Sequence, residues 1–262
     1  MTESSAGGIP ASFSYAGHGR NATIGIALCH GFTGSPLSIM PWAEALASRG
    51  FAVSVPLLPG HGTDWKDLAR TGWRDWYGAF EESYLGLSAT TTSCFAAGLS
   101  MGGAMALQLA SRHRVAGVAV VNPALSFYDR RVHFVGLLQY VMPTTTPIEE
   151  QNPTALPTSD GDYARTPLSA VHELRQLFRS TARRLPLVSA PAIVFKSASD
   201  SVVPANSLER IKRRIGSSSL SIVELPGSGH VATLDIDAPA IFEQSVKFFQ
   251  ANAPATAVSK QS

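Results

Sequence analysis

The chain has 262 residues, of which 45% are apolar and 15% are charged, and its formal net charge is +2. This length and apolar content allow one sizeable core and exclude a disordered chain. The near balance of charge gives no sign of nucleic-acid binding, and since no apolar run is long enough to cross a bilayer, no stable membrane insertion is expected.

The ends of the chain and its cysteines set the expected location. Residues 1–12 contain no basic segment followed by an apolar one, so no signal peptide is predicted and a cytoplasmic location is expected. Residues 1–12 and 251–262 are interpreted as loose tails. Cys29 and Cys94 lie in apolar runs without zinc-ligand spacing, and we interpret both as small buried side chains. Neither a metal nor a cofactor is expected, and the sequence does not distinguish a monomer from a homodimer.

Strand patterns recur along the chain from residue 11 onward. A short edge strand is expected at 11–15, and five apolar strands follow at 24–28, 52–57, 94–97, 115–121 and 192–195. A sixth strand at 220–225 is less apolar, which fits a position near the far edge of a sheet. The apolar residues of these strands are continuous rather than alternating, as expected for strands that are covered on both faces.

Helical patterns alternate with these strands. They are expected at 41–49, 72–87, 103–113, 171–184, 207–215 and 239–250. The alternation predicts an α/β fold with a mostly parallel, doubly wound sheet, helices on both faces and right-handed crossovers. Two basic runs, Arg183-Arg184 and Lys212-Arg213-Arg214, are interpreted as solvated helix faces.

One interval interrupts the alternation. Residues 123–191 contain no clear strand, although the sheet continues on both sides. We therefore expect a single domain over residues 1–262 with a small cap, residues 124–190, inserted before the last two strands. The apolar run 132–142 is expected to line a substrate pocket, with Phe134, Leu137 and Leu138 as candidate contacts.

The pentapeptide Gly98-Leu99-Ser100-Met101-Gly102 lies between a strand pattern and a helix pattern. A serine at such a corner is held in a strained and exposed position, and the flanking glycines allow the neighbouring elements to approach. Its hydroxyl would then stand at the carboxyl edge of the sheet. The pattern predicts that Ser100 is a nucleophile.

A serine hydroxyl needs a base to take its proton, and the base needs an acid to orient it. His230 follows the last strand in a short, glycine-rich loop, and Asp200 follows the strand at 192–195. Both are therefore expected at the carboxyl edge of the sheet, beside Ser100. Asp235 and Asp237 are interpreted as caps of the next helix, and a loop histidine such as His61 is interpreted as solvated.

Two backbone donors are expected to hold the oxyanion of a tetrahedral intermediate. One is the N–H of Met101, directly after the nucleophile. The other is the N–H of Phe32, in the loop His30-Gly31-Phe32-Thr33-Gly34 that follows the first apolar strand. The glycines of this loop would allow the backbone to approach the substrate.

Together these segments, with Pro59-Gly60-His61-Gly62 and Asp200-Ser201-Val202-Val203-Pro204, resemble the bacterial carboxylesterase and monoacylglycerol lipase family of α/β-hydrolases. The chain order of serine, aspartate and histidine is that of α/β-hydrolases. The resemblance covers residues 12–250 and is weakest in the cap, which is rich in Pro and Thr from residue 143. It implies an acyl-serine enzyme for short- to medium-chain esters, including monoacylglycerols. It also implies a triad of Ser100, Asp200 and His230, with Phe32 and Met101 as oxyanion donors.

The sequence leaves other activities open, because the same fold and triad serve several reactions. A thioesterase, an amidase or an aminopeptidase remains possible, and the acidic residues Glu149, Glu150, Asp160 and Asp162 of the cap leave the last of these open. Glu149 or Glu150 could instead contact the glycerol of a substrate. A non-catalytic module that binds a small ligand is the alternative from another class. The expected partner is a small-molecule ester.

Overall fold

The computed structural model describes residues 3–4, 10–129, 132, 135–138, 144–145 and 165–253, and it describes side chains from residue 12 onward except at 137 and 138. Phe134 lies outside these residues, and so do the side chains of Leu137 and Leu138. The four acidic residues of the expected cap, at 149, 150, 160 and 162, also lie outside them.

One large sheet runs through the described part of the chain. Its eight strands are β1 (Glu3–Ser4), β2 (Pro10–Tyr15), β3 (Ile24–Cys29), β4 (Ala52–Pro56), β5 (Ser93–Leu99), β6 (Val118–Val121), β9 (Ala192–Ser197) and β10 (Leu220–Leu225). Their order is β1-β2-β4-β3-β5-β6-β9-β10. β2 is antiparallel to both of its neighbours, and all other neighbouring pairs are parallel. The predicted mostly parallel sheet is confirmed, and β10 lies at its far edge.

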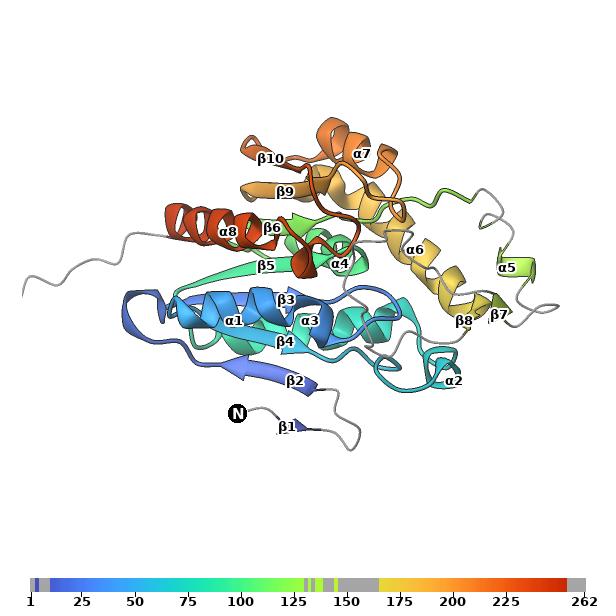
Figure 1. Cartoon of the computed structure of the whole chain (residues 1–262), viewed down its shortest axis with the longest axis horizontal. Coiled ribbons are helices and arrows are strands. Elements are labelled where there is room, and N and C mark those ends of the chain that lie inside the picture. Colours follow the sequence, from blue (N-terminus) through green and yellow to red (C-terminus); the bar gives the residue numbers. More distant parts are fainter. Residues whose placement is uncertain are drawn as a thin grey trace, which may run out of the picture.

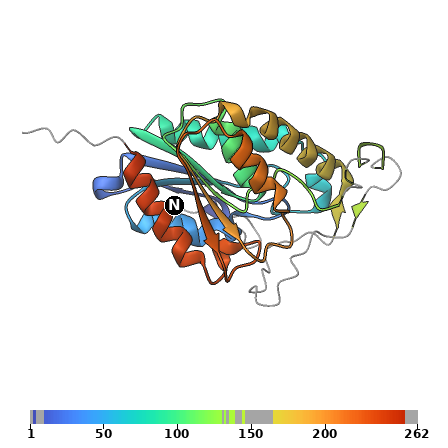
Figure 2. The same ribbon diagram turned by 90° about the horizontal axis from the view of Figure 1, so that it is seen from above.

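Helices cover both faces of this sheet (Figures 1 and 2). α1 (Met40–Ser48) and α8 (Ala238–Asn252) pack on one face. On the other face lie α3 (Trp73–Ser88), α4 (Met101–Ala110), α6 (Leu168–Arg184) and α7 (Asn206–Arg214). Every residue of α4 is buried, because α4 lies between the sheet and α6. The predicted helices on both faces are confirmed.

The boundaries differ from the predictions in a few places. Glu3–Ser4 pairs with β2, so part of the expected loose tail is a strand and β2 is not the outermost strand. β6 begins at Val118 rather than at residue 115. Val115 extended the apolar pattern because it belongs to the buried core, although it lies outside the strand. The short helix α2 (Trp65–Leu68) was not predicted, and it begins where the Asp64 side chain accepts a hydrogen bond from the Lys66 N–H at 2.8 Å.

The described elements of the segment between β6 and β9 include α5 (Val135–Leu138), β7 (Thr144–Thr145), β8 (Thr166–Pro167) and α6. Of these, α5, β7 and β8 lie at the end of the molecule toward which β3, β5 and β6 point (Figure 1). β7 and β8 form an antiparallel pair, which was not predicted, and α6 packs against both α5 and β8. α6 begins at Leu168, three residues before the predicted start.

Candidate active site

Ser100 occupies a sharp corner between β5 and α4. Its backbone has φ 56° and ψ −114°, a conformation that is unfavourable for a residue with a side chain. The glycines on either side are required by space: a Cβ atom on Gly102 would overlap the carbonyl of Cys29, and one on Gly98 would overlap the backbone of Gly102. α4 therefore begins directly after Ser100, two residues earlier than predicted, and the predicted strained corner is present.

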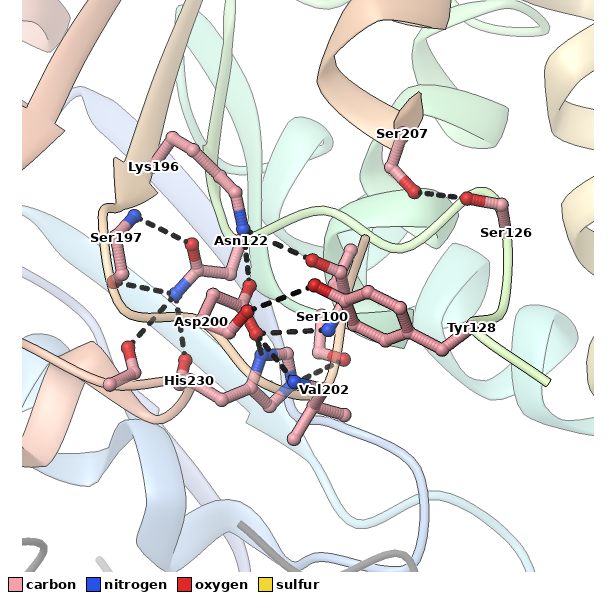
Figure 3. Close-up of polar contacts among 12 residues, drawn as sticks. Ser100, Asn122, Ser126, Tyr128, Lys196, Ser197, Asp200, Val202, Ser207 and His230 are labelled. Atoms are coloured by element: carbon pink, nitrogen blue, oxygen red, sulfur yellow. Dashed lines mark hydrogen bonds and ion pairs between the residues drawn. The ribbon is translucent and has the colours of Figure 1, made fainter. Parts of the chain in front are cut away.

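Ser100, His230 and Asp200 form a continuous chain of hydrogen bonds (Figure 3). His230 Nε2 lies 2.9 Å from Ser100 Oγ, and His230 Nδ1 lies 3.0 Å from Asp200 Oδ1. Asp200 comes from the loop after β9 and His230 from the loop after β10. Because a carboxylate can only accept, Nδ1 carries the imidazole proton and Nε2 is left to accept the proton of the serine hydroxyl. The structure thus brings together the three residues that the sequence analysis singled out.

Asp200 is fixed as an ionised carboxylate. Its Oδ1 also accepts the backbone N–H groups of Val202 and Val203 at 3.0 and 2.9 Å. Burial alone would raise the pKa of Asp200, but the hydrogen bond and charge of His230, together with Lys196 and the Val203 N–H, outweigh it and lower the pKa to about 2. The carboxylate is therefore charged across the neutral pH range.

Lys196 supplies a positive charge behind the acid. Its Nζ lies 2.5 Å from Asp200 Oδ2, the oxygen that does not face His230, and it also donates to the carbonyl oxygen of Val203. Both side chains are shielded, with 15% of the lysine and 1% of the aspartate exposed. The sequence analysis gave Lys196 no role. A lysine near the end of an otherwise apolar strand, four residues before the acid, was the available signal.

Asn122 ties the histidine loop to the sheet. It has φ 44° and is fully buried directly after β6. Its Nδ2 donates to the carbonyl oxygen of His230 at 2.8 Å and to Ser197 Oγ at 2.9 Å, and its Oδ1 accepts the Ser197 N–H at 2.9 Å. One amide side chain thus joins the ends of β6 and β9 to the backbone of His230 (Figure 3). The sequence analysis did not identify this residue.

Asp235 and Asp237 hold the same loop from the other side. Asp235 Oδ2 accepts the Gly229 N–H at 2.8 Å, and Asp237 Oδ2 accepts the Gly227 N–H at 2.9 Å. Asp237 occupies the N-cap position of α8, but its side chain makes no capping hydrogen bond. The expected capping role is therefore wrong for both residues: Asp235 lies before the N-cap position, and both carboxylates accept N–H groups of the loop that carries His230.

The two expected oxyanion donors lie beside Ser100. Met101 is the first residue of α4, and the N–H groups of the first helical turn have no acceptor inside the helix. Phe32 lies in the loop after β3, where a Cβ atom on the preceding Gly31 would be 3.7 Å from the Cβ atom of Ser100. The ring of Phe32 packs against Trp76, with ring centroids 5.8 Å apart.

Two buried histidines pack beside the loop that carries Phe32. His30 and His61 are buried and their ring centroids are 5.2 Å apart. His30 Nε2 accepts the Leu58 N–H at 3.2 Å, and His61 Nδ1 lies 3.1 Å from the Pro59 carbonyl oxygen. Burial lowers the pKa of His30 to about 4 and, with the added effect of His30, lowers that of His61 to about 3. The expectation of a solvated His61 is wrong, because its ring packs under Phe32 and Trp76.

The described residues contain neither a candidate metal cluster nor a candidate membrane span. No group of three or more His, Cys, Asp or Glu side chains within them is placed to hold a metal ion. None of the helices in the described ranges is long and apolar enough to cross a membrane. Cys29 and Cys94 are both free and buried, as predicted, and burial raises the pKa of Cys94 to about 12.

Comparison with known proteins gives consistent matches along the chain. The model of the Alpha/beta hydrolase family matches residues 26–244. A thermostable monoacylglycerol lipase from Bacillus sp. (strain H-257) is 36% identical over 240 residues, which are 90% of this chain and 94% of that protein. A carboxylesterase from Bacillus subtilis (strain 168) is 24% identical over 226 residues, which are 86% of this chain and 92% of the relative.

A solved structure is also similar over most of the chain. It belongs to a study of LipS and LipT, two metagenome-derived lipolytic enzymes, and it superimposes with a TM-score of 0.85 at 30% sequence identity. The match covers 93% of this chain and 99% of the other.

Proposed function

Since the chain belongs to the alpha/beta hydrolase family, we propose that it is a serine hydrolase that cleaves carboxylic esters through an acyl-serine intermediate. The observation that carries this proposal is the hydrogen-bonded series Ser100 Oγ, His230 Nε2 and Nδ1, Asp200 Oδ1, with distances of 2.9 and 3.0 Å, mounted on the strained corner at Ser100. In this assignment Ser100 is the nucleophile, His230 the base and Asp200 the orienting acid.

The first half of the reaction forms the acyl-enzyme. Ser100 Oγ attacks the carbonyl carbon of the ester while its proton passes to His230 Nε2. The oxygen of the carbonyl becomes an oxyanion and accepts the N–H groups of Phe32 and Met101. The bond to the leaving alcohol then breaks, and His230 Nε2 returns its proton to that alcohol. The acyl group remains on Ser100.

The second half releases the acid. A water molecule gives a proton to His230 Nε2 and attacks the acyl carbon, and the bond to Ser100 Oγ breaks as the proton returns to the serine. Asp200 stays ionised throughout, so it keeps the imidazole in the productive tautomer and stabilises its positively charged form. The low pKa of Asp200 supports this role.

Monoacylglycerols and other short- to medium-chain esters are the proposed substrates. The names of the two curated relatives, a monoacylglycerol lipase and a carboxylesterase, support this class. We propose that residues 124–190 form a cap over the carboxyl edge of the sheet, and that Phe134, Leu137 and Leu138 contact the acyl chain. The described end of this segment, α6, packs on α4 behind the nucleophile. A cytoplasmic location is part of the proposal, since two free cysteines fit a reducing compartment.

A hydrolysis series tests the proposed function. p-Nitrophenyl esters from acetyl to palmitoyl are compared with monoacyl-, diacyl- and triacylglycerols, using wild type and Ser100→Ala. The expected result is a medium-chain optimum, turnover of monoacylglycerol, little turnover of triacylglycerol and no activity in the variant. Turnover of amides or thioesters with none of any ester would contradict the proposed ester specificity. Full activity of Ser100→Ala would contradict the proposed nucleophile.

A further inference from the structure

A groove on the face that carries α3 and α6 is lined by arginine side chains. The two helices lie side by side on this face (Figures 1 and 2), and the groove has a volume of about 480 Å³. Arg74 of α3 and Arg179, Arg183 and Arg184 of α6 line it, and none of the described lining residues is an aspartate or a glutamate. This volume falls within the range of small-molecule sites.

One acidic side chain borders the groove: Glu173 accepts the Trp73 N–H at 3.2 Å and Gln176 Nε2 at 2.6 Å. Within the described ranges, none of the four arginines forms an ion pair. Arg184 instead donates from Nε to Ser111 Oγ at 2.9 Å and from Nη2 to the Ser111 carbonyl oxygen at 3.1 Å. The guanidinium of Arg74 lies 4.9 Å from the centre of the Trp73 ring. Neutral partners thus hold two of the arginines in place.

The arginines of α6 also repel one another. Arg175, Arg179 and Arg183 recur every four residues, and like charges at this spacing destabilise a helix. Desolvation and the charge of Arg179 lower the pKa of Arg175. Arg183 is exposed, as predicted for a solvated helix face. It also lines the groove together with Arg74, which comes from α3. An anion between the two helices would offset this repulsion.

We propose that the groove between α3 and α6 binds a small phosphate-bearing anion, either a free phosphate ester or the headgroup of a lipid. Guanidinium groups donate pairs of parallel hydrogen bonds to phosphate oxygens, and four of them call for more than a single negative charge. Ser180 adds a neutral donor: its Oγ accepts from Gln108 Nε2 at 3.1 Å, so its own proton can point to a ligand. Trp73 also lines the groove, with 6% of the residue exposed.

The groove is separate from the proposed active site but is linked to it through α6. This helix packs on α4, which begins directly after the corner at Ser100, and on α5 and β8 of the segment between β6 and β9. A ligand that binds only the folded chain stabilises it by RT ln(1 + L/Kd), where L is the free ligand concentration, so the melting temperature should continue to rise with ligand concentration even when the site is nearly full.

Titration calorimetry with inorganic pyrophosphate, in chloride buffer at constant ionic strength, tests the proposal on the full chain. We expect saturable binding of one pyrophosphate per chain. Arg179→Ala/Arg183→Ala should weaken it at least tenfold, and Arg179→Lys/Arg183→Lys, which keeps the charge, should weaken it less. Arg213→Ala/Arg214→Ala is the matched control, because it removes two exposed arginines from α7 and should leave the affinity unchanged.

Two further probes distinguish the source of the phosphate. Binding of glycerol phosphate in solution supports a free phosphate ester. Sedimentation with vesicles of phosphatidylglycerol, but not with phosphatidylcholine alone, supports a lipid headgroup. Ester turnover near wild type in both double alanine variants shows that each is folded. Binding of none of these probes, or equal losses in the two double alanine variants, overturns the proposal. Octanoate that binds as tightly as pyrophosphate through the same arginines overturns the ligand class.

Discussion

The nucleophile side and the acid–base side of the candidate site are built in different ways. Ser100 is placed by the backbone: a strand, a residue at φ 56° and a helix that starts at the next residue. Asp200 and His230 are placed by hydrogen bonds from their surroundings: Lys196 and two backbone N–H groups hold Asp200, and Asn122 and Asp235 hold the loop of His230. The first arrangement is local and strained, whereas the second is a hydrogen-bond network that also joins segments as far as 108 residues apart in the chain. The two should therefore respond differently to substitution.

The largest expected effects come from Ser100 itself. Ser100→Ala should lower kcat by about a million-fold, the scale seen when a nucleophile of this type is removed. It should leave the melting temperature near wild type, because the strained backbone is unchanged. Ser100→Gly should be equally inactive but more stable by about 1 kcal/mol, since glycine adopts positive φ without strain. Kinetics and denaturant unfolding of both variants check this. A glycine variant less stable than the alanine variant would contradict the claim that the backbone at Ser100 is strained.

The next effect concerns the acid. Asp200→Asn should lower kcat by about ten-thousand-fold, because the amide favours the wrong tautomer of His230. Asp235→Asn is the matched control: it retains an oxygen that can accept the Gly229 N–H, and its kcat should fall less than tenfold. If the larger loss follows the Asp235 substitution, the proposed acid is the wrong one.

Acid should also weaken the fold through Asp200. The pKa of Asp200 is lowered to about 2 in the folded state from an ordinary value of 3.8, so the carboxylate stabilises the fold above pH 4. This contribution, about 2 kcal/mol, is lost as the pH falls from about 4 to about 2. Urea unfolding of wild type and Asp200→Asn over this pH range measures it. A pH dependence that is the same in both proteins would contradict the assignment.

Asn122→Ala tests the two halves of the site separately. It removes the hydrogen bonds of the Asn122 side chain to Ser197 and His230 and leaves the strained corner at Ser100 unchanged. It strips partners from the buried Ser197 N–H and the His230 carbonyl, so we expect a loss of about 2 kcal/mol in the free energy of unfolding. It should also lower kcat roughly tenfold to a hundredfold with little change in KM, since the base is misplaced. An unchanged kcat in a destabilised variant would show that Asn122 supports the fold alone.

The smallest expected effect is a shift of the pH profile in Lys196→Met. The substitution removes a positive charge from beside the Asp200–His230 pair, so the acidic limb of kcat/KM should move to higher pH by less than about one unit. Lys196→Arg keeps the charge and should keep the wild-type limb. A profile that Lys196→Met leaves in place would show that the lysine only fills space behind the acid.

The same contrast explains what the sequence could predict. The strands, the helices and the corner at Ser100 could be predicted because each depends on residues close together in the chain. At the corner, Gly98 and Gly102 lie within two residues of Ser100. The order of Asp200 and His230 at successive strand ends was also readable. The role of Asn122 was not, because its partners at Ser197 and His230 lie 75 and 108 residues away. His61 was misjudged because nothing local indicates that Trp76 and Phe32 cover its ring.

The most direct test of the central claim is to locate a covalent adduct. Wild type and Asp200→Asn are treated with a fluorophosphonate, and intact mass and peptide mapping then give the number and position of adducts. We expect one adduct per wild-type chain, on Ser100, formed much more slowly in the Asp200 variant. An adduct on another residue, or ester turnover that persists in a chain without any adduct, would contradict the acyl-serine mechanism.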